Sequence, residues 1–222
     1  MLVSPHSSSN PKMIFQVLFI VSLLITSLSS ADIAFDYCVG DLTLPSGPTG
    51  YSCKDPAKVT ADDFVYSGLS VAGNTKNLFK FGASTAFASQ FPGLNGMGLS
   101  LTRADLEVGG AVPIHTHRVS ELIIVIEGTI IAGFIDTNNT AYYKTLNKGD
   151  IMIFPPTLLH FQVNSGSTPV LAYACFANEN PGIQLVTTSL FRNNLPSELI
   201  EKVTLLDDAQ IKKLKKILGG TN

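Results

Sequence analysis

Between residues 99 and 191 the sequence repeats one pattern, in which a short apolar run is closed within two residues by Gly, Pro, Asn or Asp. The runs span residues 122–126, 129–135, 151–154, 170–176 and 183–191. Runs this short and this closely spaced are typical of β-strands in a sandwich or barrel. Two of them, 122–126 and 129–135, are apolar at almost every position, which favours strands covered on both faces or buried between subunits. The pattern predicts a single all-β domain.

The sequence after residue 195 changes character and predicts short helices. Pro196 is placed to begin one helix, and Asp207 with Gln210 forms a capping box for a second that ends at Gly219-Gly220. One face of this second helix is apolar, with Ile211, Leu214 and Leu218 at helical spacing. Its lysines are predicted to form a solvated face: Lys212, Lys213, Lys215 and Lys216.

An uncharged apolar segment, residues 14–28, follows Lys12 and leads into the small residues Ser29, Ser30 and Ala31. This is the pattern of a secretory signal peptide. A membrane-spanning helix usually needs about 20 apolar residues, more than this run contains. We therefore expect residues 1–30 to be removed and residues 31–222 to form the mature, secreted domain, without membrane insertion. Because Met13 directly precedes the apolar run, residues 1–12 are either a long leader or an upstream extension.

Without residues 1–30 the chain keeps 14 of its 15 Lys and Arg residues and all 17 Asp and Glu residues, a net charge of 14 − 17 = −3. A weakly acidic chain has no basic field to hold phosphates, so nucleic acid is not expected as a partner.

The cysteines agree with an oxidising compartment. Cys38 and Cys53 flank a loop rich in Gly and Pro that has little core of its own, and a disulfide between them is predicted. Such a bridge contributes about 3 kcal/mol in the loop-entropy model. Cys175 lies inside the run 170–176 and is predicted to be a buried, inert thiol. Asn138-Asn139-Thr140 is an acceptor sequence for N-glycosylation at Asn138.

All three histidines of the expected mature chain fall into one constellation. His115 and His117 are two residues apart, so in a strand their rings project from one face, and Glu121 follows close behind. His160 lies on the far side of the run 151–154, where an adjacent strand would deliver it to the same place. Three imidazoles and one carboxylate suit a divalent ion, and Mn(II) or Fe(II) fits better than structural Zn(II), which prefers closed tetrahedral sites.

The spacing around these residues resembles the two cupin motifs. In the first, Gly109 is followed after five residues by His115, then by His117, Glu121 and, after six residues, Gly128. Three residues separate His117 from Glu121, where germins usually have four.

The second cupin motif has Gly149, Pro155, His160 and Asn164 in register, with Thr157 where the pattern has Gly. A Gly there takes positive φ before the ligand strand, so Thr157 is expected either to shift His160 or to form a different turn.

Nearly the whole mature chain resembles plant germin-like proteins, through Tyr37-Cys38, Cys53, Ala72-Gly73-Asn74-Thr75 and Asn180-Pro181-Gly182. The stretches 63–68, 129–134 and 148–153 and the tail 209–222 are most similar to the auxin-binding subgroup. The resemblance implies a cupin β-jelly-roll over residues 31–222 with C-terminal helices. It also implies one Mn(II) per subunit on three His and one Glu, a hexamer built as a trimer of dimers, and a glycosylated, defence-associated protein of the apoplast and cell wall.

The resemblance offers several functions. Superoxide dismutation asks least of the pocket, because a small anion needs only an open coordination position, a redox-active metal and a proton source. Oxalate oxidation is not expected, since Thr102 and Val112 occupy positions where oxalate-oxidising germins have two asparagines, and Val112 cannot donate a hydrogen bond. The alternatives are an auxin-binding protein, in which the metal holds a small carboxylate, and a non-catalytic wall or storage protein.

Overall fold

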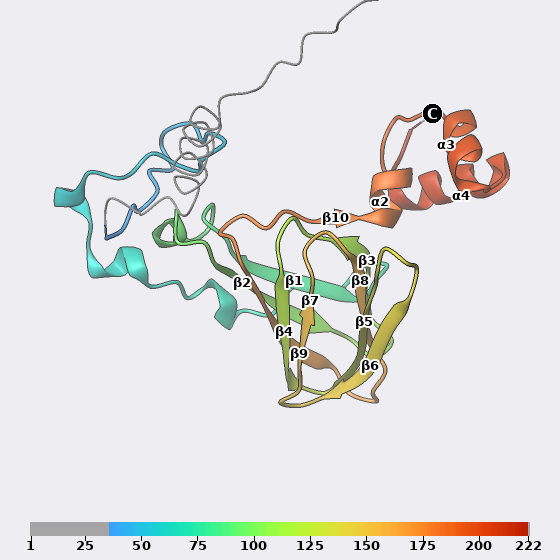
Figure 1. The fold of residues 1–222 in the computed structure, drawn as a ribbon, viewed down its shortest axis with the longest axis horizontal. Helices are drawn as coiled ribbons and strands as arrows, with labels where there is room; N and C mark the ends of the chain where they lie inside the picture. The colour runs from blue at the N-terminus through green and yellow to red at the C-terminus, as the bar shows by residue number, and fades with distance from the viewer. Residues whose placement is uncertain (1–35, 222) are drawn as a thin grey trace, which may run out of the picture. The chain divides into compact units, whose positions relative to one another are not determined.

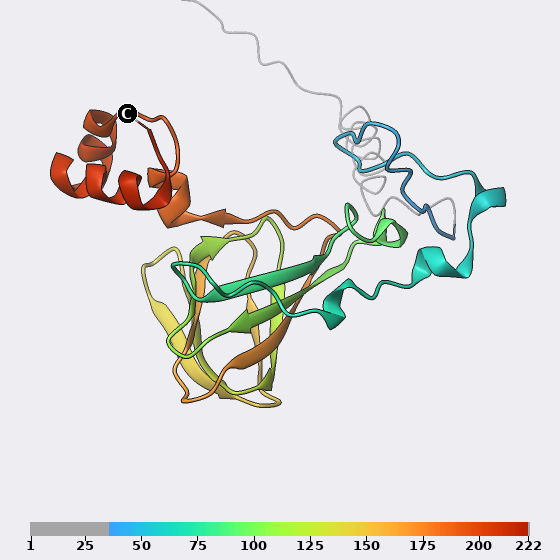
Figure 2. The ribbon, with the colours of Figure 1, turned by 180° about the vertical axis from the view of Figure 1, so that it is seen from behind.

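The computed structural model describes residues 36–221, which leaves the predicted signal peptide, residues 1–30, outside the described part. Within these described residues, ten strands and three α-helices follow one another (Figures 1 and 2). The strands are β1 Phe81–Ala86, β2 Ser100–Leu106, β3 Ala111–Thr116, β4 Glu121–Glu127, β5 Thr129–Ile135, β6 Ala141–Asn147, β7 Ile151–Phe154, β8 Leu159–Asn164, β9 Val170–Phe176 and β10 Gln184–Leu185. The helices are α2 Val186–Phe191, α3 Ser197–Thr204 and α4 Asp208–Leu218. Four single-turn 3-10 helices lie before β2, at Pro56–Lys58, Ala61–Phe64, Gly68–Ser70 and Pro92–Leu94.

The strands form two antiparallel five-stranded sheets, ordered β1-β2-β9-β4-β7 and β10-β3-β8-β5-β6. Alternate residues point inward, as β4 illustrates: Ile123 and Val125 are buried, while Leu122, Ile124 and Ile126 stay partly exposed. The inward residues of both sheets form one apolar core that includes Leu106, Ile130 and Ala172. This is the predicted all-β jelly-roll, and the runs 129–135, 151–154 and 170–176 coincide with β5, β7 and β9.

The prediction of a strand over residues 183–191 was wrong. Only Gln184–Leu185 is strand, and the chain then turns into α2. The reason is tertiary packing: Phe191, at the end of α2, is buried against Ile200 of α3 and Ile211 of α4. A helix places Phe191 in this second, smaller core, and that packing outweighs the strand preference of the β-branched residues in the segment.

The C-terminal helices follow the predicted caps. Pro196 precedes α3, and the Asp207 and Gln210 side chains each accept a hydrogen bond from the other's backbone N–H, at 2.8 and 3.1 Å. Helix α4 ends at Leu218 and is capped by Gly219, whose φ is +83°. The prediction that all four lysines are solvated was wrong for Lys215, which is only 3% exposed.

The buried ammonium group of Lys215 is hydrogen-bonded to the loop before α3 and to the C-terminal residues. It donates to three backbone carbonyls, those of Leu195 at 2.5 Å, Thr221 at 2.8 Å and Asn193 at 3.4 Å. The buried cation is therefore solvated by peptide dipoles and ties the C-terminus of the described chain to the loop before α3.

The disulfide between Cys38 and Cys53 is present, as predicted. Cys175 differs from its prediction, because it lies on the outward face of β9 and is exposed in the single chain, while its neighbours Ala174 and Phe176 point inward. Among residues 36–221, no helix has the length and apolar character needed to cross a membrane.

Candidate metal centre

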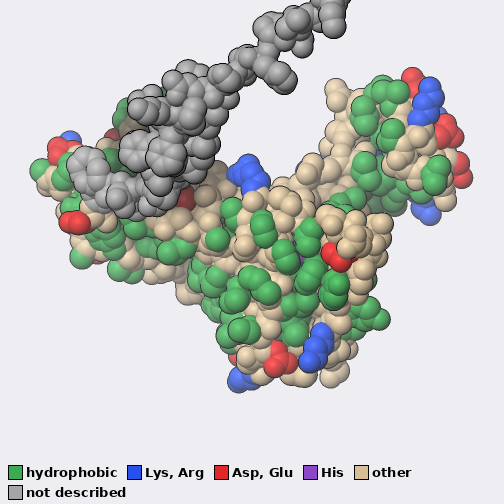
Figure 3. Space-filling view, in the orientation of Figure 1, with side chains coloured by type: hydrophobic (Ala, Val, Ile, Leu, Met, Phe, Trp, Pro, Cys, Tyr) green, Lys and Arg blue, Asp and Glu red, His purple; other side chains and the backbone are tan. Residues whose placement is uncertain are grey.

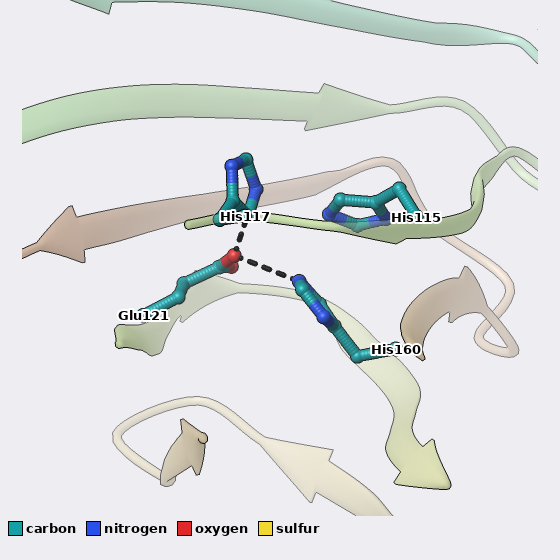
Figure 4. A group of neighbouring side chains, drawn as sticks. All are labelled: His115, His117, Glu121 and His160. Atoms are coloured by element: carbon teal, nitrogen blue, oxygen red, sulfur yellow. Dashed lines mark hydrogen bonds and ion pairs between the residues drawn. The ribbon is translucent and has the colours of Figure 1, made fainter. Parts of the chain in front are cut away.

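The four predicted ligands converge inside the barrel, at one end of three strands (Figure 4). His115 lies in β3 and His117 follows that strand directly, while Glu121 is the first residue of β4. Strands β3 and β8 pair so that His115 is directly opposite His160. A shift of register in β3 between Val112 and His115 precedes this pair, and irregularities of this kind re-aim side chains near functional sites.

The donor atoms are close enough to share one ion. The four donor atoms lie within 4.8 Å of one another, and all four residues are buried. Glu121 Oε2 is 3.0 Å from His160 Nε2 and 3.2 Å from His117 Nε2. Metal–ligand bonds of about 2.0–2.2 Å place donors on opposite sides of an ion about 4.0–4.4 Å apart. These separations are close to those between ligands of one ion, so the residues present fit a metal ion, and four protein donors on a six-coordinate ion would leave two positions for other ligands.

Each imidazole is oriented by a backbone carbonyl at its other nitrogen. His115 Nδ1 lies 2.8 Å from the Pro113 oxygen, and His160 Nδ1 lies 2.8 Å from the Leu158 oxygen. His117 Nδ1 is hydrogen-bonded to the Gly182 oxygen. A carbonyl can only accept, so each Nδ1 carries the proton and each Nε2 is free to bind an ion.

The protonation states also suit a metal. Burial alone would raise the pKa of Glu121, but the neighbouring imidazoles of His117 and His160 outweigh it and lower the pKa to about 2. Burial, together with the neighbouring His160, lowers the pKa of His115 to about 4. At neutral pH the cluster thus offers an ionised carboxylate and a neutral imidazole, the forms in which these groups bind metal ions.

A cavity of about 140 Å³ opens beside the cluster, and His115, His117 and Glu121 form part of its wall. The structure places the predicted pocket residues Thr102 and Val112 on this wall as well. Most of the remaining wall is apolar, with side chains from both sheets: Phe81, Leu106, Ile123, Ile130, Phe176 and Ile183.

Sequence reasoning missed Gln162, a polar residue of the cavity wall. It lies two residues beyond His160 on β8 and is 2% exposed, so both side chains point into the barrel. Within the described chain, Gln162 Nε2 and Thr102 Oγ1 are buried atoms without a hydrogen-bond partner. The two-residue spacing from a ligand histidine on a strand is the signal that would have identified Gln162.

Thr157 keeps the conformation that the motif's Gly would have. Its φ is +66°, in the left-handed region, and its N–H donates to the His117 oxygen at 2.9 Å. The turn thus takes the positive φ expected of a Gly, and Thr157 adopts it at a cost in backbone strain. The shorter spacing between His117 and Glu121 likewise leaves Glu121 within the cluster.

Comparisons with known proteins agree with this architecture. A family model described as Cupin matches residues 67–212. Auxin-binding protein ABP19a of Prunus persica is 58% identical over 95% of this chain and 100% of the relative. Germin-like protein subfamily 3 member 3 of Arabidopsis thaliana is 53% identical over the same shares of both chains. A solved structure of oxalate oxidase superposes with a TM-score of 0.81 at 30% identity, covering 86% of this chain and 98% of that one. The jelly-roll, the paired motifs and these relatives together place the chain in the cupin family, among the germin-like proteins.

Proposed function

We propose that this is a secreted, manganese-binding germin-like protein of the plant cell wall, associated with defence, that dismutes superoxide and does not oxidise oxalate. The observation that carries the proposal is the buried cluster of three imidazoles and one carboxylate beside a small cavity. His115, His117, Glu121 and His160 would hold the ion. Their mixed nitrogen and oxygen donors suit Mn(II), with Fe(II) and Zn(II) as the ions to test against it.

The chain's own groups have defined roles in this proposal. Dismutation oxidises one superoxide to O2 and reduces a second, with two protons, to H2O2. When bound, manganese would supply the one-electron redox couple for both halves. Glu121 would offset part of the ion's charge, the three imidazoles would hold the ion beside the cavity, and water would supply the protons. The apolar wall excludes groups that would compete for those positions.

The cavity wall also supports the absence of oxalate turnover. Oxalate carries two carboxylates, and the one not bound to the metal would need hydrogen-bond donors from the wall. Val112 offers none, and Thr102 offers one hydroxyl. A dianion would therefore lie mostly against apolar side chains, which is a costly place for charge.

The first experiment pairs elemental analysis of desalted, secreted protein with dismutase and oxalate oxidase assays, before and after chelation. We expect about one Mn per chain and chelator-sensitive dismutase activity without oxalate turnover. Glu121→Gln is expected to lose metal and activity together. Glu127→Gln is the matched control, because Glu127 ends the same strand and is exposed. Metal bound without dismutase activity would overturn the enzymatic part of the proposal.

A second candidate function is the binding of a small carboxylate such as auxin. It is favoured by the two unpartnered polar atoms, Thr102 Oγ1 and Gln162 Nε2, which line an otherwise apolar cavity. A ligand with a carboxylate on the metal and an apolar ring would fill that space and give Gln162 an acceptor. Calorimetric titration with indole-3-acetic acid tests this, with Gln162→Leu expected to weaken saturable binding. The third candidate, a non-catalytic wall or storage protein, is favoured if the metal-free protein keeps its assembly and neither activity nor ligand binding is found.

We also propose that the protein is a homo-oligomer, as expected a hexamer. The outward face of the sheet containing β4, β7 and β9 is apolar, as the space-filling view shows (Figure 3). On β7, Ile151 and Ile153 are 59% and 53% exposed in the single chain. Apolar exposure of this kind on adjacent strands marks an interface. Native mass spectrometry should give six chains, and Ile153→Glu should reduce that number.

Secretion and glycosylation complete the proposal. Asn138 lies in the exposed turn between β5 and β6, where a glycan would meet no neighbouring side chain of the core. Expression in a plant host should yield extracellular protein that starts near residue 31. Treatment with an endoglycosidase should reduce its mass, and Asn138→Gln should abolish that change.

A further inference from the structure

Residues 180–183, here called the strap, are bound to the two residues that follow β3. Three consecutive carbonyls of the strap face His117 and Arg118, so the contact is continuous. The bonds are Arg118 Nη2 to the Asn180 oxygen at 2.9 Å, Arg118 N to the Pro181 oxygen at 3.1 Å, and His117 Nδ1 to the Gly182 oxygen. The strap therefore contacts a candidate metal ligand and its neighbour together.

His117 differs from the other two imidazoles in where its orienting carbonyl comes from. His115 and His160 each use a carbonyl two residues earlier in their own segment. The carbonyl that orients His117 belongs to Gly182, 65 residues away in the sequence. The direction of His117 Nε2 is therefore set by whatever holds the strap in place.

The Arg118 side chain contacts the strap at Gly182 and at Asn180. Its guanidinium carbon and two of its nitrogens, Nη2 and Nε, lie 3.1–3.4 Å from the position that a Cβ on Gly182 would occupy, so the group packs directly on the glycine. Gly182 has φ +64°, a conformation that side chains disfavour. A flat guanidinium can stack on the backbone and donate to the Asn180 carbonyl in one geometry, which an ammonium group cannot reproduce.

The strap also forms part of the cavity wall. Ile183 lines the inner cavity beside the metal ligands and a separate outer hollow that includes Thr116, His117, Arg118 and Thr157. Ile183 thus separates the inner cavity from the outer hollow. Displacing the strap would open the cavity and release His117 Nδ1 in one motion.

We propose that Arg118 is a positioning residue that holds the strap closed, and thereby fixes the orientation of His117 and limits access to the metal. The inference rests on the proposed metal-binding function. It assigns Arg118 no contact with the metal or with a substrate. Its effect passes through the Gly182 carbonyl.

The test measures Mn(II) itself as the probe, in full-length mature protein. Equilibrium titration gives the dissociation constant, and excess EDTA added to loaded protein gives the release rate. Arg118→Ala is expected to raise both by about tenfold or more, the range seen when groups that orient metal ligands are removed. Arg118→Lys should give intermediate values, because it keeps a donor for Asn180 but not the stacked plane. Arg192→Ala, another exposed arginine, is the matched control.

Two further variants separate the effect of the strap on the orientation of His117 from its effect on access to the metal. Ile183→Ala should speed uptake and release alike and leave the dissociation constant within twofold of wild type. Gly182→Ala should weaken binding as Arg118→Ala does, which keeps the test decisive if Arg118→Ala fails to fold. A dissociation constant unchanged in both Arg118→Ala and Gly182→Ala, or equally raised in Arg192→Ala, would overturn this inference alone. Wild-type protein that binds no Mn(II) would instead overturn the proposed function as well.

Discussion

Replacing Thr157 with Gly is expected to stabilise the protein, because Thr157 occupies a conformation that β-branched residues rarely adopt. Its φ of +66° lies in the left-handed region, and its side chain is exposed, so little buried contact would be lost. The hydrogen bond from its N–H to the His117 carbonyl uses only backbone and survives the change. Relief of backbone strain is therefore the main effect of the substitution.

The size of the effect follows from two opposing contributions. A non-glycine residue held in a sparsely populated region costs about 1–3 kcal/mol. Glycine returns part of this, because it raises the conformational entropy of the unfolded chain by about 0.4–1 kcal/mol. The balance is a gain of about 1 kcal/mol, which corresponds to about 2–4 °C in Tm for a chain of this size.

Scanning calorimetry of metal-free protein at fixed concentration measures the change. Thr145→Gly is the matched control, since Thr145 is an exposed threonine in the extended backbone of β6 and should lose about 0.5–1 kcal/mol. The Mn(II) dissociation constant of Thr157→Gly should equal that of wild type, because the turn already has the glycine geometry. A Tm at or below wild type for Thr157→Gly would refute the assignment of strain to this residue.

Three further outcomes are expected. Because burial lowers the pKa of His115 to about 4 from 6.5, the unfolded chain takes up a proton first, and metal-free protein should lose stability as the pH falls from 6.5 toward 4. The full loss is about 3 kcal/mol, and thermal melts of His115→Asn should show a flatter slope. Lys215→Met should cost about 1–3 kcal/mol in urea denaturation, because the part-buried carbonyls of Leu195 and Thr221 lose the Lys215 donor. The matched change Lys216→Met, at an exposed lysine, should cost nothing measurable. Replacing Cys38 and Cys53 with Ser should lower the free energy of unfolding by about 3 kcal/mol, and an unchanged denaturation midpoint would contradict it.

The features predicted correctly from sequence are those encoded by neighbouring residues. Turn residues bound β5, β7 and β9, so these strands match their apolar runs residue for residue. The capping box of α4 is a contact between residues three apart, and it forms as expected. The alternation of strand residues places His115 on the inward face, and the motif spacing brings Glu121 and His160 to it. Each of these signals is short in range, because strand alternation and helix caps depend on local geometry.

The features predicted wrongly depend on what packs against a segment from elsewhere in the chain. The run 183–191 has strand composition, yet α2 forms because Phe191 joins a core supplied by α3 and α4. Lys215 belongs to a lysine-rich helix face, yet the loop before α3 and the C-terminal residues enclose it. Cys175 has an apolar sequence neighbourhood, yet strand register turns it outward. In each case the local sequence does not show which distant segment packs against the residue or which way the strand register turns it, and these contacts decide its burial and secondary structure.

The candidate metal centre also has one part that the local sequence predicts and another that it does not. Motif spacing identifies which side chains face the cavity, but the rotation of each imidazole depends on the carbonyl at its Nδ1. For His115 and His160 that carbonyl is local, so a correct strand also gives a correctly turned ring. For His117 it is supplied by Gly182, and nothing in the first motif specifies it. We therefore expect substitutions in residues 180–183 to weaken metal binding without altering any of the four candidate ligands, even though both cupin motifs stay intact.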